Sequence, residues 1–184
     1  MKPLLLALAA ATLAGPALAQ QVLPAQSEIA FVSRQMGVPV EGKFKQWTAQ
    51  IAFDPKNAAA GKVGFSIQTG SASFGSPETD AEVPKAPWFN AAKFPTASFA
   101  SSAIKPLGGG KFEVAGTLSI KGSTQPAVVP VTVTQAGATS TASGSFTIKR
   151  LDFKIGEGEW ADTSMVANDV TVKFKLALSG MAPL

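Results

Sequence analysis

Apolar and polar side chains alternate with a period of two through most of the chain, and this restricts the fold more than any other feature. Near the end of the sequence, Val170, Val172 and Phe174 alternate with Thr171 and Lys173. Such alternation is typical of strands with one buried and one solvated face. It predicts strands at 29–34, 38–44, 49–53, 63–69, 96–101, 112–120, 129–133, 144–150 and 170–178.

Eight or nine antiparallel strands and very little helix define an all-β protein, either a two-sheet sandwich or an up-and-down barrel. The barrel is favoured because Gly42 and Gly116 fall on the inward-facing set beside large aromatic residues, where glycine lets strands bend. The longest connection, 77–89, contains three prolines, which exclude a helix longer than a turn or two. We therefore expect a single antiparallel barrel of about eight strands.

The first 19 residues have the pattern of a secretory signal peptide. Lys2 precedes an apolar run from Leu4 to Leu13, and a small-x-small sequence ends at Ala19. The run is shorter than the roughly 20 apolar residues that span a bilayer. Cleavage after Ala19 would leave residues 20–184 as one domain in the periplasm or outside the cell.

The composition excludes several classes of function. The chain has no His and no Cys, so it has no Ser-His-Asp or Cys-His nucleophile system, no His or Cys metal ligand and no disulfide. Without Lys2, 15 basic residues stand against 12 acidic ones, spread along the chain. A net charge of +3 without a basic block is too small for nucleic-acid binding.

Arg150 is the charged residue with the most informative position. It shares the parity of Phe146, Ile148 and Asp152, so it belongs to the face that points into the core. Either the strand has ended and Arg150 pairs with Asp152 at the rim, or the guanidinium lies at the mouth of an apolar cavity and binds an anionic or carbonyl head group. Arg34 and Gln35 are weaker candidates of the same kind.

The segment 156–162 contains three carboxylates, Glu157, Glu159 and Asp162. Pairs of carboxylates can hydrolyse glycosides or hold Ca²⁺. This spacing fits no calcium loop, and an exposed hairpin tip would have the same composition. A hydrolase built on these groups and Asp152 requires two carboxyl groups that converge on a cleft.

Twelve Phe and three Trp are the aromatic residues of the chain. Most of the phenylalanines are expected to pack in the core. A barrel of about eight strands is either filled by side chains or open for one small ligand. The inward positions here also include small residues, namely Ser33, Gly42, Ala49, Ala97 and Gly116, which leave room among the rings.

Five peptides, in order, resemble the YceI-like family of periplasmic polyisoprenoid-binding proteins. They cover nearly all of the chain after the leader: Ser27-x-Ile29-x-Phe31 through Met36-Gly37 to Gly42-x-Phe44; Phe53-Asp54-Pro55; Trp88-Phe89-Asn90 with Phe94-Pro95-x-Ala97-x-Phe99; Gly116-x-Leu118-x-Ile120-x-Gly122 with Pro126; and Arg150-x-Asp152-Phe153 with Gly156-x-Gly158-x-Trp160.

The resemblance implies a lipocalin-like barrel with an apolar tunnel for an isoprenoid or other long-chain lipid, such as a quinone. The Gly-x-Gly-x-Trp variant is similar to the subgroup associated with membrane b-type cytochromes. Two positions depart from the family: Gln35 stands where many members carry His, and Asp80-Ala81-Glu82-Val83 replaces an Arg-Asp-x-His stretch. Functions of those histidines therefore have no counterpart here.

Residues expected to contact such a lipid are inward-facing or flank the long connection. They are Phe31, Gln35, Phe44, Phe65, Ile67, Trp88, Phe89, Phe94, Phe99, Leu118, Ile120, Phe146, Ile148, Arg150, Phe153 and Trp160. Neither a metal nor a cofactor other than the bound lipid is expected.

Three hypotheses follow. The first is a non-enzymatic periplasmic carrier that holds a polyprenyl or quinone-like lipid, with Trp88 to Phe94 at the entrance and a homodimer as one way of covering an apolar mouth. The second is the carboxylate hydrolase. The third is an assembly module with a filled core. An enclosed apolar space of roughly 300 Å³ or more would favour the first over the third.

Overall fold

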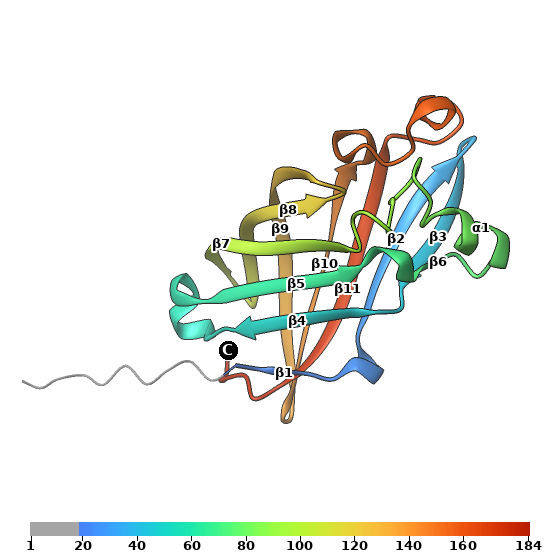
Figure 1. The fold of residues 1–184 in the computed structure, drawn as a ribbon. Coiled ribbons are helices and arrows are strands. Elements are labelled where there is room, and N and C mark those ends of the chain that lie inside the picture. Colours follow the sequence, from blue (N-terminus) through green and yellow to red (C-terminus); the bar gives the residue numbers. More distant parts are fainter. Residues whose placement is uncertain (1–18) are drawn as a thin grey trace, which may run out of the picture.

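The computed structural model describes residues 19–184, so the predicted leader lies, apart from Ala19, outside the described residues. One antiparallel sheet contains all the strands (Figure 1). The strands are β1 (Gln21–Val22), β2 (Glu28–Gln35), β3 (Val38–Phe44), β4 (Trp47–Ala52), β5 (Lys62–Gln68), β6 (Ala72–Ser73), β7 (Thr96–Gly108), β8 (Lys111–Ile120), β9 (Ser123–Ala136), β10 (Thr139–Lys149) and β11 (Asp169–Ser179).

Helical segments are short and lie between the strands. The 3₁₀ turns are η1 (Pro24–Gln26), η2 (Pro55–Ala60), η3 (Thr69–Ser71), η4 (Arg150–Phe153) and η5 (Gly158–Ala161), and the α-helix is α1 (Pro77–Glu82). Ser76 caps α1, and Pro77 occupies its first turn. None of the helices in residues 19–184 is long and apolar enough to cross a membrane.

The sheet curls around its own inner face and stays open along one seam. Its strands follow the order β4-β5-β7-β8-β9-β10-β11-β2-β3-β6, so β3 and β4 lie near opposite ends of the ladder. The N-terminal segment closes one end, because β1 pairs with β11 and Gln20 forms a bridge with Ile51 of β4. The result is a partly open barrel (Figure 1).

The all-β class predicted from the alternation is confirmed, and each of the nine predicted strands is present. The total of eleven exceeds the expected number of about eight. Two of the additional strands, β1 and β6, are two residues long, too short to show any periodicity. The predicted hairpin through Met36-Gly37 is also present, with both residues at positive φ, which suits a two-residue turn.

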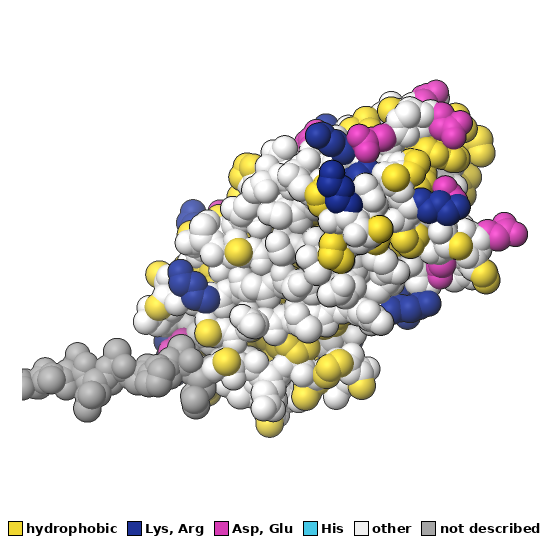
Figure 2. Space-filling view, in the orientation of Figure 1, with side chains coloured by type: hydrophobic (Ala, Val, Ile, Leu, Met, Phe, Trp, Pro, Cys, Tyr) yellow, Lys and Arg dark blue, Asp and Glu magenta, His cyan; other side chains and the backbone are white. Residues whose placement is uncertain are grey.

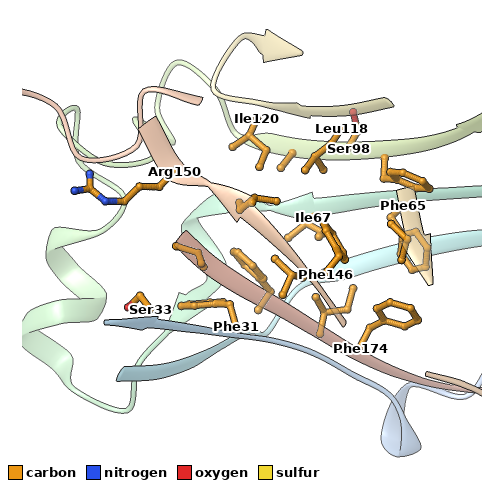
Figure 3. Close-up of a pocket in the computed structure, with 18 of the residues that line it drawn as sticks. Phe31, Ser33, Phe65, Ile67, Ser98, Leu118, Ile120, Phe146, Arg150 and Phe174 are labelled. Atoms are coloured by element: carbon orange, nitrogen blue, oxygen red, sulfur yellow. The ribbon is translucent and has the colours of Figure 1, made fainter. Parts of the chain in front are cut away.

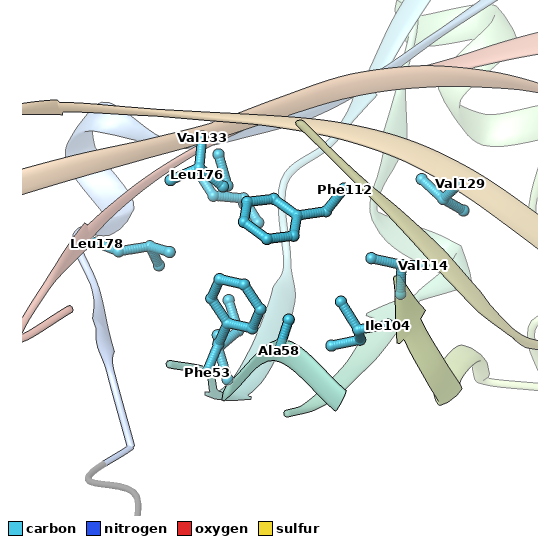
Figure 4. Packing of buried hydrophobic residues seen from close by; sticks show 11 residues of the cluster. Phe53, Ala58, Ile104, Phe112, Val114, Val129, Val133, Leu176 and Leu178 are labelled. Atoms are coloured by element: carbon cyan, nitrogen blue, oxygen red, sulfur yellow. The ribbon is translucent and has the colours of Figure 1, made fainter. Parts of the chain in front are cut away.

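The largest cluster of buried hydrophobic side chains lies at the end of the barrel that β1 closes. Figure 4 shows Phe53 from the segment after β4 packed against Phe112 of β8, with Leu176 and Leu178 of β11 beside them. The two phenylalanine rings meet edge to face, with 5.0 Å between their centroids. This geometry is favourable for aromatic pairs, and the two rings line the cavity at its closed end.

Glycines on the inner face lie beneath phenylalanine rings from adjacent strands. A Cβ added to Gly42 would meet Phe31, one added to Gly116 would come 2.6 Å from Phe99 Cζ, and one added to Gly144 would come 2.7 Å from Phe174 Cζ. From the sequence, Gly42 and Gly116 are expected at bends that leave room in the interior. The rings occupy that room, so these glycines let large side chains lie flat against the wall.

Gly116→Ala is expected to lower the free energy of unfolding by about 1–3 kcal/mol, because the added methyl would overlap both the Phe99 ring and the carbonyl oxygen of Ala100. Urea unfolding would measure the change. Gly64→Ala is the matched control, since its Cβ would lie 3.8 Å from the nearest atom, an ordinary contact. Equal stability of the two variants would contradict this account of the glycine.

Candidate functional site

An elongated apolar cavity of about 620 Å³ lies inside the curled sheet. Figure 3 shows its lining side chains, with Arg150 at one end and Phe65 and Phe174 toward the other. This volume exceeds roughly 300 Å³, which is the lower end of the range for pockets that bind small ligands. The assembly-module hypothesis requires an interior filled by side chains. The cavity inside this sheet is inconsistent with that requirement.

All but two of the residues predicted to contact a ligand line this cavity. They are Phe31, Gln35, Phe44, Phe65, Ile67, Trp88, Phe89, Phe99, Leu118, Ile120, Phe146, Ile148, Arg150 and Trp160. Phe94 and Phe153 are not among the lining residues. Phe94 covers Gly122 in the β8–β9 turn, and Phe153, 3% exposed, packs in the cluster behind Leu118 and Ile155.

The lining also includes residues that were not predicted to contact a ligand. At the closed end they include Phe53, Phe112, Val133, Leu176 and Leu178. Most of these lie on the inward parity of predicted strands, so extending the same alternation along each strand would have found them. Glu78, Thr79, Glu82 and Met165 lie on α1 or a loop, where no alternation marks them.

The other end of the cavity opens between the β2–β3 hairpin, α1 and the loop that precedes β11. Met36 at the hairpin tip lines the cavity yet is 77% exposed, and Met165 is 46% exposed. The Met36 backbone N–H donates to the Met165 carbonyl at 2.8 Å, which joins the hairpin to the loop. Figure 2 shows hydrophobic atoms at the surface of this end of the molecule. We refer to it as the entrance.

Arg150 is 1% exposed, and backbone carbonyls take up all of its N–H groups. Nε donates to Ala167, Nη1 to Ile155 and Gly156, and Nη2 to Trp160 and Val166, at 2.6–3.1 Å. A guanidinium has five N–H donors, so none is left for a ligand. Burial lowers the pKa of Arg150, and the group remains charged at neutral pH.

Neither expectation for Arg150 matches this geometry. The strand does end at Lys149, but Arg150 forms no ion pair with Asp152 among the described residues. In Figure 3 its guanidinium points away from the apolar lining. Arg150 fixes the fold of the segment between β10 and β11, and Gly156 at φ +80° is required because a Cβ there would overlap Arg150 Nη1.

Lys121 joins three segments at the same end of the barrel. Its ammonium group, 4% exposed, donates to the carbonyls of Ala86 and Lys154 and to the Glu157 carboxylate at 2.7–2.9 Å. Ala86 belongs to the long connection, and the other two partners belong to the segment after η4. Lys121 therefore holds the Trp88 region and the Trp160 region together, and the two indole rings lie 5.3 Å apart.

The ion pair predicts a pH dependence. The hydrogen bond from Lys121 and its charge hold the pKa of Glu157 below its ordinary value. The pKa of Glu157 is lower in the folded protein than in the unfolded chain, where it is about 4.3. The ion pair therefore stabilises the folded protein above the unfolded pKa, and this stabilisation is lost as the pH falls through the pKa of the folded protein. The Tm of Glu157→Gln should lie below wild type at pH 7, and the difference should vanish in acid.

Thermal unfolding between pH 7 and pH 3 would measure this difference. Glu159→Gln is the control, because Glu159 is exposed and has no ion pair among the described residues. A pH profile of Glu157→Gln that runs parallel to wild type would show that the ion pair makes no net contribution.

The four carboxylates of the hydrolase hypothesis all belong to exposed residues, and none lines the cavity. Glu157 is bound to Lys121, and Asp162 accepts hydrogen bonds from the backbone and hydroxyl of Ser164, which lower its pKa. Within residues 19–184, the side chains of Asp152 and Glu159 form no hydrogen bond or ion pair that directs them toward a common point. The convergence that this hypothesis needs is missing, and residues 19–184 contain no cluster of groups that could hold a metal.

A second recess of about 700 Å³ borders the N-terminal segment, β3 and β4. Its lining includes Glu28, Lys43, Lys45 and Thr48 and few large apolar side chains. It suits water and ions better than a hydrocarbon. The apolar cavity is therefore the candidate functional site.

A curled antiparallel sheet around one elongated apolar cavity defines a small-ligand-binding β-barrel. The model of the YceI-like domain family matches residues 21–178. The chain therefore belongs to the YceI-like domain family, as the five peptides indicated.

Relatives and solved structures agree with this. A UPF0312 protein of Vibrio cholerae serotype O1 is 31% identical over 114 residues, which cover 61% of this chain and 60% of the relative. BcnA of Burkholderia cenocepacia is 46% identical with a TM-score of 0.83, over 85% of this chain and 99% of BcnA. A Saccharophagus degradans protein described as a polyisoprenoid binding domain shares the fold, with 16% identity and a TM-score of 0.70, over 90% of this chain and 98% of that one.

Proposed function

We propose that this protein is a periplasmic carrier that binds a lipid with an isoprenoid or other long hydrocarbon tail, of polyprenyl or quinone-like type. The observation that carries the proposal is the apolar cavity of about 620 Å³. Each buried CH₂ contributes about 0.8 kcal/mol, so ten carbons contribute about 8 kcal/mol before the cost of ordering the ligand.

Family membership supports this function, and the polyisoprenoid binding attributed to the Saccharophagus degradans neighbour is consistent with it. The periplasmic location rests on the leader pattern of residues 1–19. A membrane b-type cytochrome as partner and a homodimer over the entrance remain predictions from the resemblance and from the exposed apolar mouth.

Native mass spectrometry of the protein purified from a bacterial periplasm tests the proposal. The expected spectrum contains protein with an added mass that organic extraction removes, and the extract should contain a long-chain lipid. Delipidated protein should take up an added isoprenoid at a ratio of one to one. A bare mass together with no uptake of added isoprenoid would contradict the proposal.

A further inference from the structure

The charged groups around the cavity restrict the polar end of any ligand. Of the described residues that line the cavity, Glu78, Glu82 and Arg150 are the charged ones. The uncharged polar groups are the side chains of Ser33, Gln35, Thr79 and Ser98 and the indole N–H groups of Trp88 and Trp160, and Trp88 Nε1 is buried with no hydrogen-bond partner among the described residues. A ligand whose tail fills the apolar part must therefore leave its polar end among these groups or in solvent at the entrance.

Neither buried cation is available to an anionic head group. Arg150 uses its five N–H groups on five carbonyls, and its guanidinium points away from the cavity lining (Figure 3). Lys121 does not line the cavity, and its ammonium group is bound to two carbonyls and Glu157. Releasing either cation to a phosphate would leave buried carbonyl groups without donors, which is unfavourable.

The side of the entrance formed by α1 carries carboxylates. Glu78 and Glu82 of α1 line the cavity, and Asp80 lies between them in sequence. Hydrogen bonds from the Phe74 backbone and the Ser73 hydroxyl lower the pKa of Asp80, so it is ionised at neutral pH. The lysines nearest to these groups are paired, Lys85 with Glu82 and Lys45 with Asp80. Among the described residues, Glu78 forms no ion pair, so its carboxylate is the unpaired charge of this group and would repel an anionic head.

We propose, on the basis of the proposed lipid-binding function, that the cavity selects long-chain lipids with an uncharged polar end and rejects phosphate and diphosphate heads. A hydroxyl or carbonyl group can bond to Gln35, which offers both a donor and an acceptor, or to the Thr79 hydroxyl. Neither interaction requires a counter-ion. The site thus discriminates by repulsion at the entrance as well as by apolar fit within.

Two ligands with the same C20 tail test this selectivity, geranylgeraniol and geranylgeranyl diphosphate. Binding to delipidated protein can be followed by tryptophan fluorescence, because Trp88 and Trp160 line the cavity. We expect the alcohol to bind about tenfold more tightly than the diphosphate at low salt, with the gap closing as salt screens the charges. Equal affinities, or tighter binding of the diphosphate, would overturn the inference and leave the lipid-binding function intact.

Variants can separate the effect of the entrance carboxylates on binding from the effect of the ligand's hydrocarbon tail. Glu78→Gln/Glu82→Gln should improve diphosphate binding about fivefold with little change for the alcohol, whereas Glu113→Gln, which removes a charge outside the lining, should change neither. Gln35→Lys leaves α1 intact and should also favour the diphosphate. If neither entrance variant changes the ratio, the carboxylates are not selective. If wild type binds neither ligand, the lipid-binding function itself fails and the inference falls with it.

Discussion

Replacing Arg150 with methionine is expected to lower the free energy of unfolding by about 3–5 kcal/mol, because the buried carbonyls of the segment between β10 and β11 would lose their donors. These carbonyls come from Ile155, Gly156, Trp160, Val166 and Ala167. Urea unfolding measures the loss. The segment also carries Trp160, so the variant should retain less bound lipid after purification.

Two further substitutions make this result interpretable. Arg150→Lys keeps the charge but has three donors, and it should recover only part of the stability. Arg34→Met is the matched control, because Arg34 is exposed and, among the described residues, its guanidinium donates a single hydrogen bond of 3.3 Å, to the Gly37 carbonyl. If Arg150→Met is no less stable than Arg34→Met, the carbonyl cluster does not depend on the guanidinium.

Ala97→Trp is expected to reduce co-purified lipid at least tenfold while the protein remains folded. Ala97 lies on the inner face of β7, is 7% exposed and lines the cavity beside Leu118 and Ile120. An indole at this position would occupy space that the proposed tail needs. Overpacking typically costs about 1–3 kcal/mol, and the open cavity should place this variant at the lower end of that range.

Ala100→Trp is the control for this variant, because it makes the same change at an exposed position on the same strand. Its lipid content, measured by extraction and mass spectrometry, should equal that of wild type. If both variants retain the lipid, the ligand does not occupy the cavity. If both lose it, the effect comes from disturbance of β7 and not from occupied volume.

The alternation in the sequence was sufficient to predict nine of the eleven strands and part of the cavity wall. Side-chain parity is a property of each strand alone, so Phe31, Phe65 and Phe146 could be assigned to the interior without knowing which strands are neighbours. The turn at Met36-Gly37 was also predictable, because a two-residue connection between alternating segments fixes the hairpin.

The entrance could not be predicted in the same way, because its geometry depends on loops. The parity of Arg150 indicated an inward position, but no local pattern shows that carbonyls up to 17 residues away converge on its guanidinium. Phe94 and Phe153, which were also predicted to contact a ligand, do not line the cavity for a related reason. Both lie outside the regular strands, where backbone turns and not alternation decide which way a ring points.

The unpaired seam between β3 and β4 has a consequence for the range of ligands. In a closed barrel, a continuous ladder of backbone hydrogen bonds fixes the circumference and hence the thickest molecule that fits. Here β3 and β4 form no ladder with each other, but the two-residue connection 45–46 joins β4 to β3 at one end and the Gln20–Ile51 bridge joins its other end to the N-terminal segment. We expect any adjustment of the barrel's width to the bulk of the proposed lipid to be confined to the unpaired stretch between these two ties.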